Sequence, residues 1–131
     1  MSGNTILLVE DTPSLARLYK QYLDGEDADV TVVGTGKEAL AALTAATPSL
    51  VLLDLRLPDM DGLDILKEIR SRELPCEVVV ITAHGSINVA VEAMRAGAYD
   101  FLVKPFNADR LLVTVRNALK HRSLSAIVET I

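Results

Sequence analysis

The sequence predicts an α/β domain: a doubly wound sheet of five parallel strands with five helices. Five short apolar runs, rich in Val, Ile and Leu, alternate with segments whose apolar residues recur at helical spacing. The runs are apolar at consecutive positions, which is typical of strands buried on both faces of a parallel sheet. Strands and helices that alternate in this way place helices on both sides of the sheet.

The first half of the chain contains three predicted strands and two predicted helices. Thr12 and Pro13 suit the N-cap and the first position of a helix whose apolar residues recur as far as Leu23. Glycines at 34 and 36 end the second strand, and Pro48 ends the second helix. The other elements are strands at Ile6–Val9, Asp29–Val33 and Leu50–Leu53 and a helix at Lys37–Ala46.

The second half continues the alternation after a loop, Leu55–Asp61. Gly97 suits the C′ position after the fourth helix, and Asn107 suits the N-cap of the fifth helix, which runs to about Lys120. The remaining elements are a helix from Gly62 to about Arg72, a strand at Glu77–Ile81, a helix from Gly85 and Ser86 to about Ala96, and a strand at Tyr99–Val103.

Length and composition describe one small domain. The 131 residues can form a single hydrophobic core, which we assign to residues 1–121. Residues 122–131 either extend the last helix or begin a linker. A net charge of −5 and an aromatic content of 4% disfavour direct nucleic-acid binding. No apolar run reaches the ~20 residues of a membrane helix, no secretory signal is visible, and the single Cys76 cannot form an internal disulfide. A cytoplasmic location, without membrane contact, is therefore expected.

Polar residues follow four of the predicted strands at the points where these strands end. Glu10 and Asp11 follow the first strand, and Asp54 follows the third. Thr82 and Lys104 follow the fourth and fifth strands. Because ligands bind beyond the carboxyl ends of strands in open parallel sheets, we expect these five side chains to converge on one site.

The residue types at this predicted site suit phosphoryl transfer with a hard cation. Three carboxylates within ~5 Å repel one another by roughly 3 kcal/mol per pair at an effective dielectric of about 20. Oxygen ligands with room for water favour Mg²⁺ as the neutralising ion. With Lys104 as a second positive charge, Asp54 can act as a nucleophile that forms an acyl phosphate, and Thr82 can bind a phosphoryl oxygen.

Each of these residues taken alone also has a structural explanation. Asp54 could cap the end of its strand, and Glu10 and Asp11 could favour the N-terminus of the following helix through its dipole. Thr82 could be an ordinary loop residue and Lys104 a solvated lysine at a turn. Their occurrence together, at four strand ends of one pattern, favours the functional interpretation.

Four motifs together resemble the receiver domains of bacterial two-component response regulators, over residues 4–120. They are Leu-Val-Glu-Asp (8–11), Leu-Leu-Asp-Leu-Arg-Leu-Pro-Asp-Met-Asp-Gly (52–62), Val-Ile-Thr-Ala-His-Gly (80–85) and Asp-Phe-Leu-Val-Lys-Pro-Phe (100–106). The resemblance implies the flavodoxin-like (CheY-like) fold, with strand order 2-1-3-4-5. It also implies a signalling domain rather than an enzyme, catalysing only its own phosphorylation and dephosphorylation.

The resemblance assigns a chemical role to the acidic residues. It implies that Asp54 accepts a phosphoryl group from a phosphohistidine on a sensor histidine kinase or a histidine phosphotransfer protein. It further implies that Mg²⁺ is bound by Asp11, Asp54 and the backbone carbonyl of Arg56. Glu10 is expected to contribute through a metal-bound water.

The resemblance also assigns a switch. Thr82 and Lys104 are expected to contact the phosphoryl oxygens, and the Lys104–Pro105 peptide bond is expected to be cis. On phosphorylation Thr82 would move toward the phosphate and Phe101 would turn inward. The face formed by the fourth helix, the fifth strand and the fifth helix would then change its preference for partners.

Further segments resemble the receivers of NtrC-type activators, including quorum-sensing regulators. They are Thr-Ala-His-Gly-Ser-Ile (82–87), Val-Glu-Asp-Thr-Pro-Ser (9–14), Val-Gly-Thr-Gly-Lys (33–37) and Ala-Asp-Arg-Leu-Leu-Val-Thr-Val (108–115). Such regulators continue into an ATPase that works with sigma-54 polymerase and into a DNA-binding domain, and this chain carries the motifs of neither. The resemblance implies a receiver separated from its output domains, with residues 122–131 as a linker or as a helix forming a homodimer. A natural stand-alone receiver is the alternative.

Other classes of protein fit the pattern less well. A haloacid-dehalogenase-type phosphatase would have a second acid two residues after its nucleophile, where this chain has Arg56. A flavodoxin would bind the FMN phosphate in a first loop rich in Ser, Thr and Gly, where this chain has Glu10 and Asp11. A purely structural domain would have no need of three carboxylates and a lysine at its strand ends.

Overall fold

Five parallel strands form one sheet in the order β2-β1-β3-β4-β5, as the resemblance implied. The computed structural model describes residues 3–83 and 87–130, with side chains up to residue 124. The strands are β1 (Thr5–Val9), β2 (Asp29–Val33), β3 (Leu50–Asp54), β4 (Glu77–Ala83) and β5 (Asp100–Lys104). The helices are α1 (Pro13–Leu23), α2 (Gly36–Ala45), α3 (Gly62–Ser71), α4 (Ile87–Arg95) and α5 (Ala108–Thr130).

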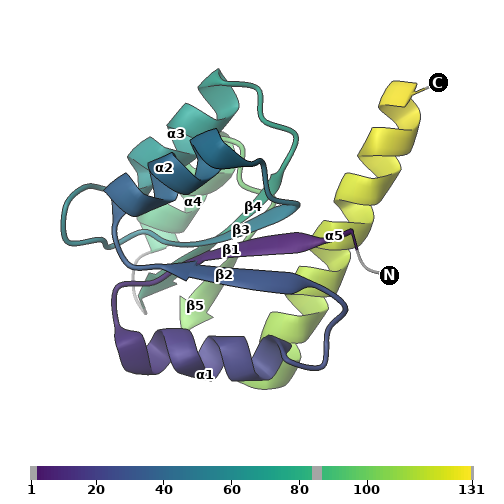
Figure 1. Cartoon of the computed structure of the whole chain (residues 1–131). Helices are drawn as coiled ribbons and strands as arrows, with labels where there is room; N and C mark the ends of the chain where they lie inside the picture. Colours follow the sequence, from purple (N-terminus) through teal and green to yellow (C-terminus); the bar gives the residue numbers. More distant parts are fainter. Residues whose placement is uncertain (1–2, 84–86, 131) are drawn as a thin grey trace.

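The helices cover both faces of the sheet, with α1 and α5 on one side and α2, α3 and α4 on the other (Figure 1). Successive side chains of a strand point to opposite faces, so each central strand contributes to two cores. In β3, Val51 and Leu53 belong to the core under α2 and α3, whereas Leu50 and Leu52 belong to the core under α1 and α5. This division explains why the central strands are apolar at consecutive positions.

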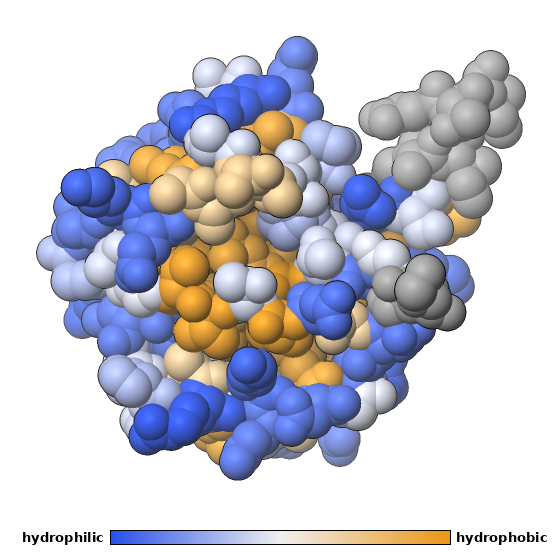
Figure 2. Space-filling view, viewed as in Figure 1, coloured by the Kyte–Doolittle hydropathy of each residue, from blue (hydrophilic) through white to orange (hydrophobic). Residues whose placement is uncertain are grey.

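The prediction of burial on both faces is wrong for β2. This strand lies at the edge of the sheet, where it pairs with β1, and Val32 is 38% exposed. Figure 2 shows apolar residues at the surface in this region, between α1 and α2. The apolar composition of Asp29–Val33 predicted a strand correctly, but its exposure depends on the strand order.

Two predicted boundaries were too short because contacts between distant elements extend them. β4 continues past Ile81 to Ala83, since Thr82 and Ala83 pair with β5. α5 continues past Lys120 to Thr130, and near its middle His121 contacts Glu77 at the start of β4. The predicted start of a helix at Gly85 and Ser86 lies outside the described residues.

The helix ends follow the predicted capping residues, with one exception. Asn107 Oδ1 accepts a hydrogen bond from the backbone N–H of Arg110 at 2.8 Å, as expected of an N-cap. Gly97 has a φ of 106° after α4, the left-handed conformation expected at C′. Thr12 occupies the N-cap position of α1, but its side chain makes no capping hydrogen bond.

Candidate functional site

The predicted polar residues lie close together at the carboxyl ends of β1 and β3, where the order of the strands in the sheet reverses. β1 is flanked by β2 and β3, so the chain leaves β1 and β3 toward helices on opposite faces and opens a crevice at their carboxyl ends. A cavity of about 430 Å³ lies there. Its lining includes the predicted residues Asp11, Asp54, Arg56, Thr82 and Lys104.

Lys104 connects two of the buried acids. Its Nζ lies 2.6 Å from Asp54 Oδ2 and 3.0 Å from Glu10 Oε1. Burial acts to lower the pKa of Lys104, but the contacts with Asp54 and Glu10 outweigh it and raise the pKa above its ordinary value. Lys104 is therefore a fixed positive charge beside Asp54.

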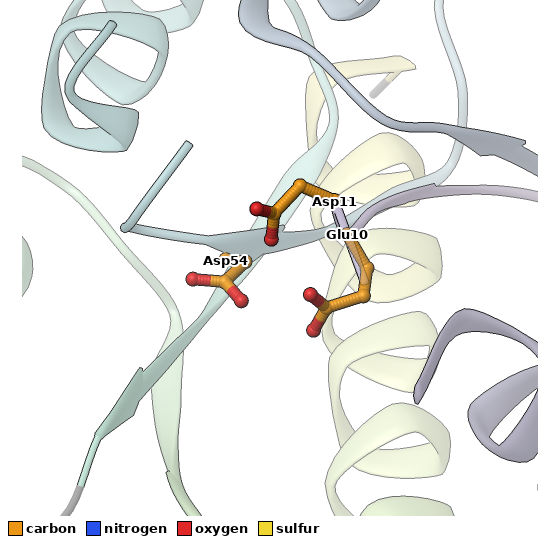
Figure 3. Close-up of side chains that lie close together, drawn as sticks. All are labelled: Glu10, Asp11 and Asp54. Carbon is orange, nitrogen blue, oxygen red and sulfur yellow. The ribbon is translucent and has the colours of Figure 1, made fainter. Parts of the chain in front are cut away.

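Glu10, Asp11 and Asp54 direct their carboxylates toward a common space (Figure 3). Each offers one oxygen, and these three oxygens lie within 4.8 Å of one another. The pKa of Glu10 is raised to about 7 because burial penalises its charge, an effect that Lys104 opposes and Asp54 reinforces. The cluster thus holds more negative charge than Lys104 alone balances.

The donor atoms of this cluster fit a divalent cation. Glu10 Oε2 accepts the backbone N–H of Thr12 at 3.2 Å, and Lys104 Nζ lies 3.0 Å from the buried Oε1. Glu10 and Asp54 share this one ammonium group, so a second cation would reduce the repulsion that remains among the three carboxylates. Carboxylate oxygens are the ligands that Mg²⁺ prefers, so the residues present suit this ion.

Arg56 is positioned by the backbone beside Asp54. Its N–H donates a hydrogen bond of 2.8 Å to Asp54 Oδ1, so each oxygen of Asp54 has one donor. The Arg56 side chain is exposed. The part of Arg56 that lies next to the carboxylate is therefore its backbone.

The two proposed switch residues occupy different places. Thr82 is buried and lines the cavity. Phe101 is half-buried against the core beneath α2, α3 and α4 and is not part of the cavity lining. The Lys104–Pro105 peptide bond is cis, as expected. Thr82 therefore lines the same cavity as Asp11 and Asp54, whereas Phe101 packs against the core outside it.

Six further residues that line the cavity were not identified as site residues from the sequence. They are Thr12, Leu55, Asp61, Ile81, Ala83 and Val89. Thr12 was interpreted as a helix cap, and Asp61 also acts as one, since its Oδ1 accepts the N–H of Leu63 at 2.9 Å. Capping signals are local, whereas membership of the cavity depends on the arrangement of β1, β3 and α4.

Replacing one acid should show that the cluster binds a cation. We expect Asp11→Asn to unfold at a higher temperature than the unmodified chain in metal-free buffer, because the repulsion among the clustered carboxylates is reduced. Mg²⁺ should raise the unfolding temperature of the unmodified chain and have little effect on Asp11→Asn. Thermal unfolding by circular dichroism, with and without Mg²⁺, measures both. Asp64→Asn, on the exposed first turn of α3, is the control, and an equal Mg²⁺ response in Asp11→Asn would contradict the prediction.

The fold and the acidic crevice define a class of protein. A family model for the response regulator receiver domain matches residues 6–116. The chain therefore belongs to the response regulator receiver domain family.

Within this family the chain is similar to several regulatory proteins, among them one from Vibrio cholerae and one from Salmonella typhimurium. It is 53% identical over 116 residues to the regulatory protein LuxO of Vibrio cholerae, covering 88% of this chain and 26% of LuxO. It is 37% identical over 121 residues to the DNA-binding transcriptional regulator NtrC of Salmonella typhimurium, covering 92% of this chain and 26% of NtrC. It thus spans about a quarter of the length of these curated relatives.

Solved structures support the same assignment. The crystal structure of the signal receiver domain of a LuxO repressor protein from Vibrio parahaemolyticus matches with a TM-score of 0.92 at 47% identity, covering 96% of this chain and 97% of that one. NtrX from Brucella abortus matches with a TM-score of 0.91 at 37% identity, covering 98% of this chain and 29% of NtrX.

Among the described residues, no helix has the length and hydropathy needed to cross a membrane.

Proposed function

We propose that Asp54 accepts a phosphoryl group from a phosphohistidine of a sensor histidine kinase or a histidine phosphotransfer protein. The observation that carries this proposal is the contact between Asp54 and Lys104 at the acidic end of the crevice, with Nζ 2.6 Å from Oδ2. This contact holds a nucleophilic carboxylate and a fixed positive charge side by side, where charge develops on a transferring phosphoryl group.

The chemistry assigned to the chain is one displacement at phosphorus. A carboxylate oxygen of Asp54 forms a bond to phosphorus, the bond from phosphorus to the histidine nitrogen breaks, and the departing imidazole takes up a proton. Lys104 and the hydroxyl of Thr82 would hold phosphoryl oxygens. Bound Mg²⁺, held by Asp11, Asp54 and the Arg56 carbonyl with help from Glu10, supplies further positive charge. Hydrolysis of the acyl phosphate restores Asp54.

The consequence we propose is a change of the face formed by α4, β5 and α5. Thr82 would move toward the phosphoryl group and Phe101 would turn inward behind it. Large apolar side chains on this face are already exposed, namely Ile87, Val91, Met94, Val103 and Val113. A partner that buries them in only one of the two states would bias the equilibrium between the states.

The output of this switch is proposed from the relatives. The chain is similar to part of LuxO and to part of NtrC, a DNA-binding transcriptional regulator. We therefore propose that residues 1–121 are the receiver of such a regulator and that residues 122–131 lead toward its output domains. The regulated process would be sigma-54-dependent transcription, with quorum sensing as its setting.

Three assays distinguish this function from the alternatives. With acetyl phosphate and Mg²⁺, intact-mass spectrometry should show one added phosphoryl group, stable in acid and removed by base or hydroxylamine. Steady release of product from p-nitrophenyl phosphate would instead support a phosphatase. A yellow flavin spectrum would support a flavodoxin, and no addition at all would contradict the proposal.

Removing Lys104 should separate phosphorylation from the switch. We expect Lys104→Ala to keep some phosphorylation, because Asp54 remains, and to lose most of the structural response, because nothing draws β5 to the phosphate. Hydrogen exchange of α4 and β5, measured before and after acetyl phosphate, reports this response. Lys67→Ala, an exposed lysine on α3, is the control. An unchanged response in Lys104→Ala would remove Lys104 from the switch.

A further inference from the structure

One exposed carboxylate outside the acidic cluster joins the β3–α3 loop to α2. Asp59 Oδ1 accepts the backbone N–H of Gly36 at 2.8 Å, and its Oδ2 accepts that of Lys37 at 2.9 Å. These two donors hold the pKa of Asp59 below its ordinary value, so the carboxylate is charged at neutral pH. Both oxygens therefore make charge-assisted bonds to the N-terminus of a helix far away in sequence.

The helix has a cap of its own for the next N–H groups. Thr35 Oγ1 accepts the N–H of Glu38 at 3.1 Å, and the Thr35 carbonyl accepts that of Ala39 at 3.0 Å. Glu38 Oε1 in turn accepts the backbone N–H of Gly34, the residue before the cap, at 3.2 Å. Because α2 is already capped by Thr35, the contact with Asp59 matters mainly for the loop.

Met60, the next residue of the loop, also contacts the N-terminus of α2, through packing of its side chain. A Cβ at Gly36 would lie 2.3 Å from Met60 Cγ and 2.4 Å from its Sδ, so the Met60 side chain occupies the space that a larger residue would fill. Asp59 and Met60 thus contact the same residue of α2, one through hydrogen bonds and the other through packing. The tip of the loop is fixed at this point.

The other end of the loop carries the backbone of the site. Arg56 pairs with Asp61 in an isolated bridge, and the N–H of Gly62 donates to the Leu55 carbonyl at 2.9 Å. The Arg56 N–H in turn binds Asp54 Oδ1. The position of the Arg56 backbone is therefore determined by two sets of contacts. One set joins the two ends of the loop, and the other joins Asp59 and Met60 to α2.

We infer that Asp59 is a positioning residue for the cation site: by binding the N-terminus of α2, it holds the loop that carries the Arg56 backbone beside Asp54. This inference rests on the proposed function, in which that carbonyl is a ligand. Asp59 touches neither the cation nor the phosphoryl group. Outer contacts that orient metal ligands alter metal affinity when they are removed.

The test compares Mg²⁺ affinity with the rate of phosphorylation. Calorimetry on the unphosphorylated chain gives the dissociation constant for Mg²⁺, and intact-mass kinetics with acetyl phosphate give the Mg²⁺ concentration for half-maximal rate and the maximal rate. The variants are Asp59→Ala, Asp59→Asn and the control Asp64→Ala, which removes the same charge from the neighbouring turn of α3. Far-UV circular dichroism should be unchanged in all three, since Asp59 is exposed and Thr35 still caps α2.

We expect Asp59→Ala to weaken Mg²⁺ binding about tenfold. The half-maximal Mg²⁺ concentration should rise equally, while the maximal rate at saturating Mg²⁺ stays near that of the unmodified chain. The Mg²⁺ affinity of Asp59→Asn should lie between those of Asp59→Ala and the unmodified chain, because the amide of asparagine keeps only one of the two acceptor oxygens.

Equal Mg²⁺ affinity in the Asp59 variants and the unmodified chain would overturn the inference, as would an equal loss in Asp64→Ala. If the unmodified chain binds Mg²⁺ but is not phosphorylated, the proposed function fails and the affinities still decide the role of Asp59. If the unmodified chain binds no Mg²⁺, both fail.

Discussion

Asp54→Asn should abolish the addition of a phosphoryl group by acetyl phosphate while leaving the fold intact. The amide is a poor nucleophile, so the step that forms the acyl phosphate has no acceptor. The fold should persist because an asparagine has nearly the same shape and its oxygen can still accept the Arg56 N–H that now binds Asp54 Oδ1. Intact-mass spectrometry gives the stoichiometry, and circular dichroism shows whether the variant is folded.

Two comparisons make this result specific to Asp54. Asp61→Asn changes another acid that lines the same cavity and caps α3, and it should remain phosphorylated, because asparagine also serves as a helix cap. Lys104 must be left in place in both variants, since it contacts Asp54 directly. Full modification of Asp54→Asn would refute the assignment of the acceptor.

Gly62→Ala should be the most destabilising small substitution near the site. A Cβ at Gly62 would lie 2.6 Å from the Leu55 Cα and 2.7 Å from the Asp54 carbonyl oxygen. Both are backbone atoms, so no side chain can rotate away and the end of β3 must shift. We expect a loss of about 3 kcal/mol in the free energy of unfolding, at the upper end of the range for overpacking. Urea denaturation measures it.

The same substitution should also impair phosphorylation, because the atoms displaced are those that carry Asp54. Gly25→Ala is the matched control, since a Cβ there meets nothing within 4 Å. It should change the free energy of unfolding by less than about 1 kcal/mol, as surface substitutions usually do. Equal stabilities of the two variants would show that β3 and the loop tolerate the added methyl group.

The central fold is predictable from the sequence because burial on both faces leaves a local pattern. β3 is apolar at four consecutive positions, and the structure buries its whole length. The exposure of β2 has no such local cause, since its apolar residues look like those of a central strand and only the strand order places it at the edge. The strand order itself came from the resemblance to a family.

The lengths of elements depended on contacts that the local sequence does not show. The last helix continues past Lys120, and there His121 contacts Glu77 and packs its ring against Tyr99, 5.0 Å away between centroids. These partners lie on β4 and just before β5, so the helical pattern alone could not reveal them. Whether residues 122–131 lead to a further domain stays a prediction.

The convergence of the polar residues at the strand ends was predictable from the sequence, but the other cavity residues and the internal contacts of the site were not. The rule that ligands bind at the carboxyl ends of parallel strands was enough to group Asp54, Thr82 and Lys104. That Lys104 reaches both Asp54 and Glu10, and that burial raises the pKa of Glu10, depends on distances fixed by β1, β3 and β5 together. The chemical roles of these residues, and that of Phe101 in the switch, stay predictions.

The most direct test of the account is to locate the phosphoryl group. After incubation with acetyl phosphate, borohydride reduces an aspartyl phosphate to homoserine, and peptide mass spectrometry identifies the modified position. The account predicts homoserine at position 54 alone, formed with Mg²⁺ and largely absent without it. Modification of Asp11 or Asp61 in place of Asp54, or equal modification with and without Mg²⁺, would contradict it.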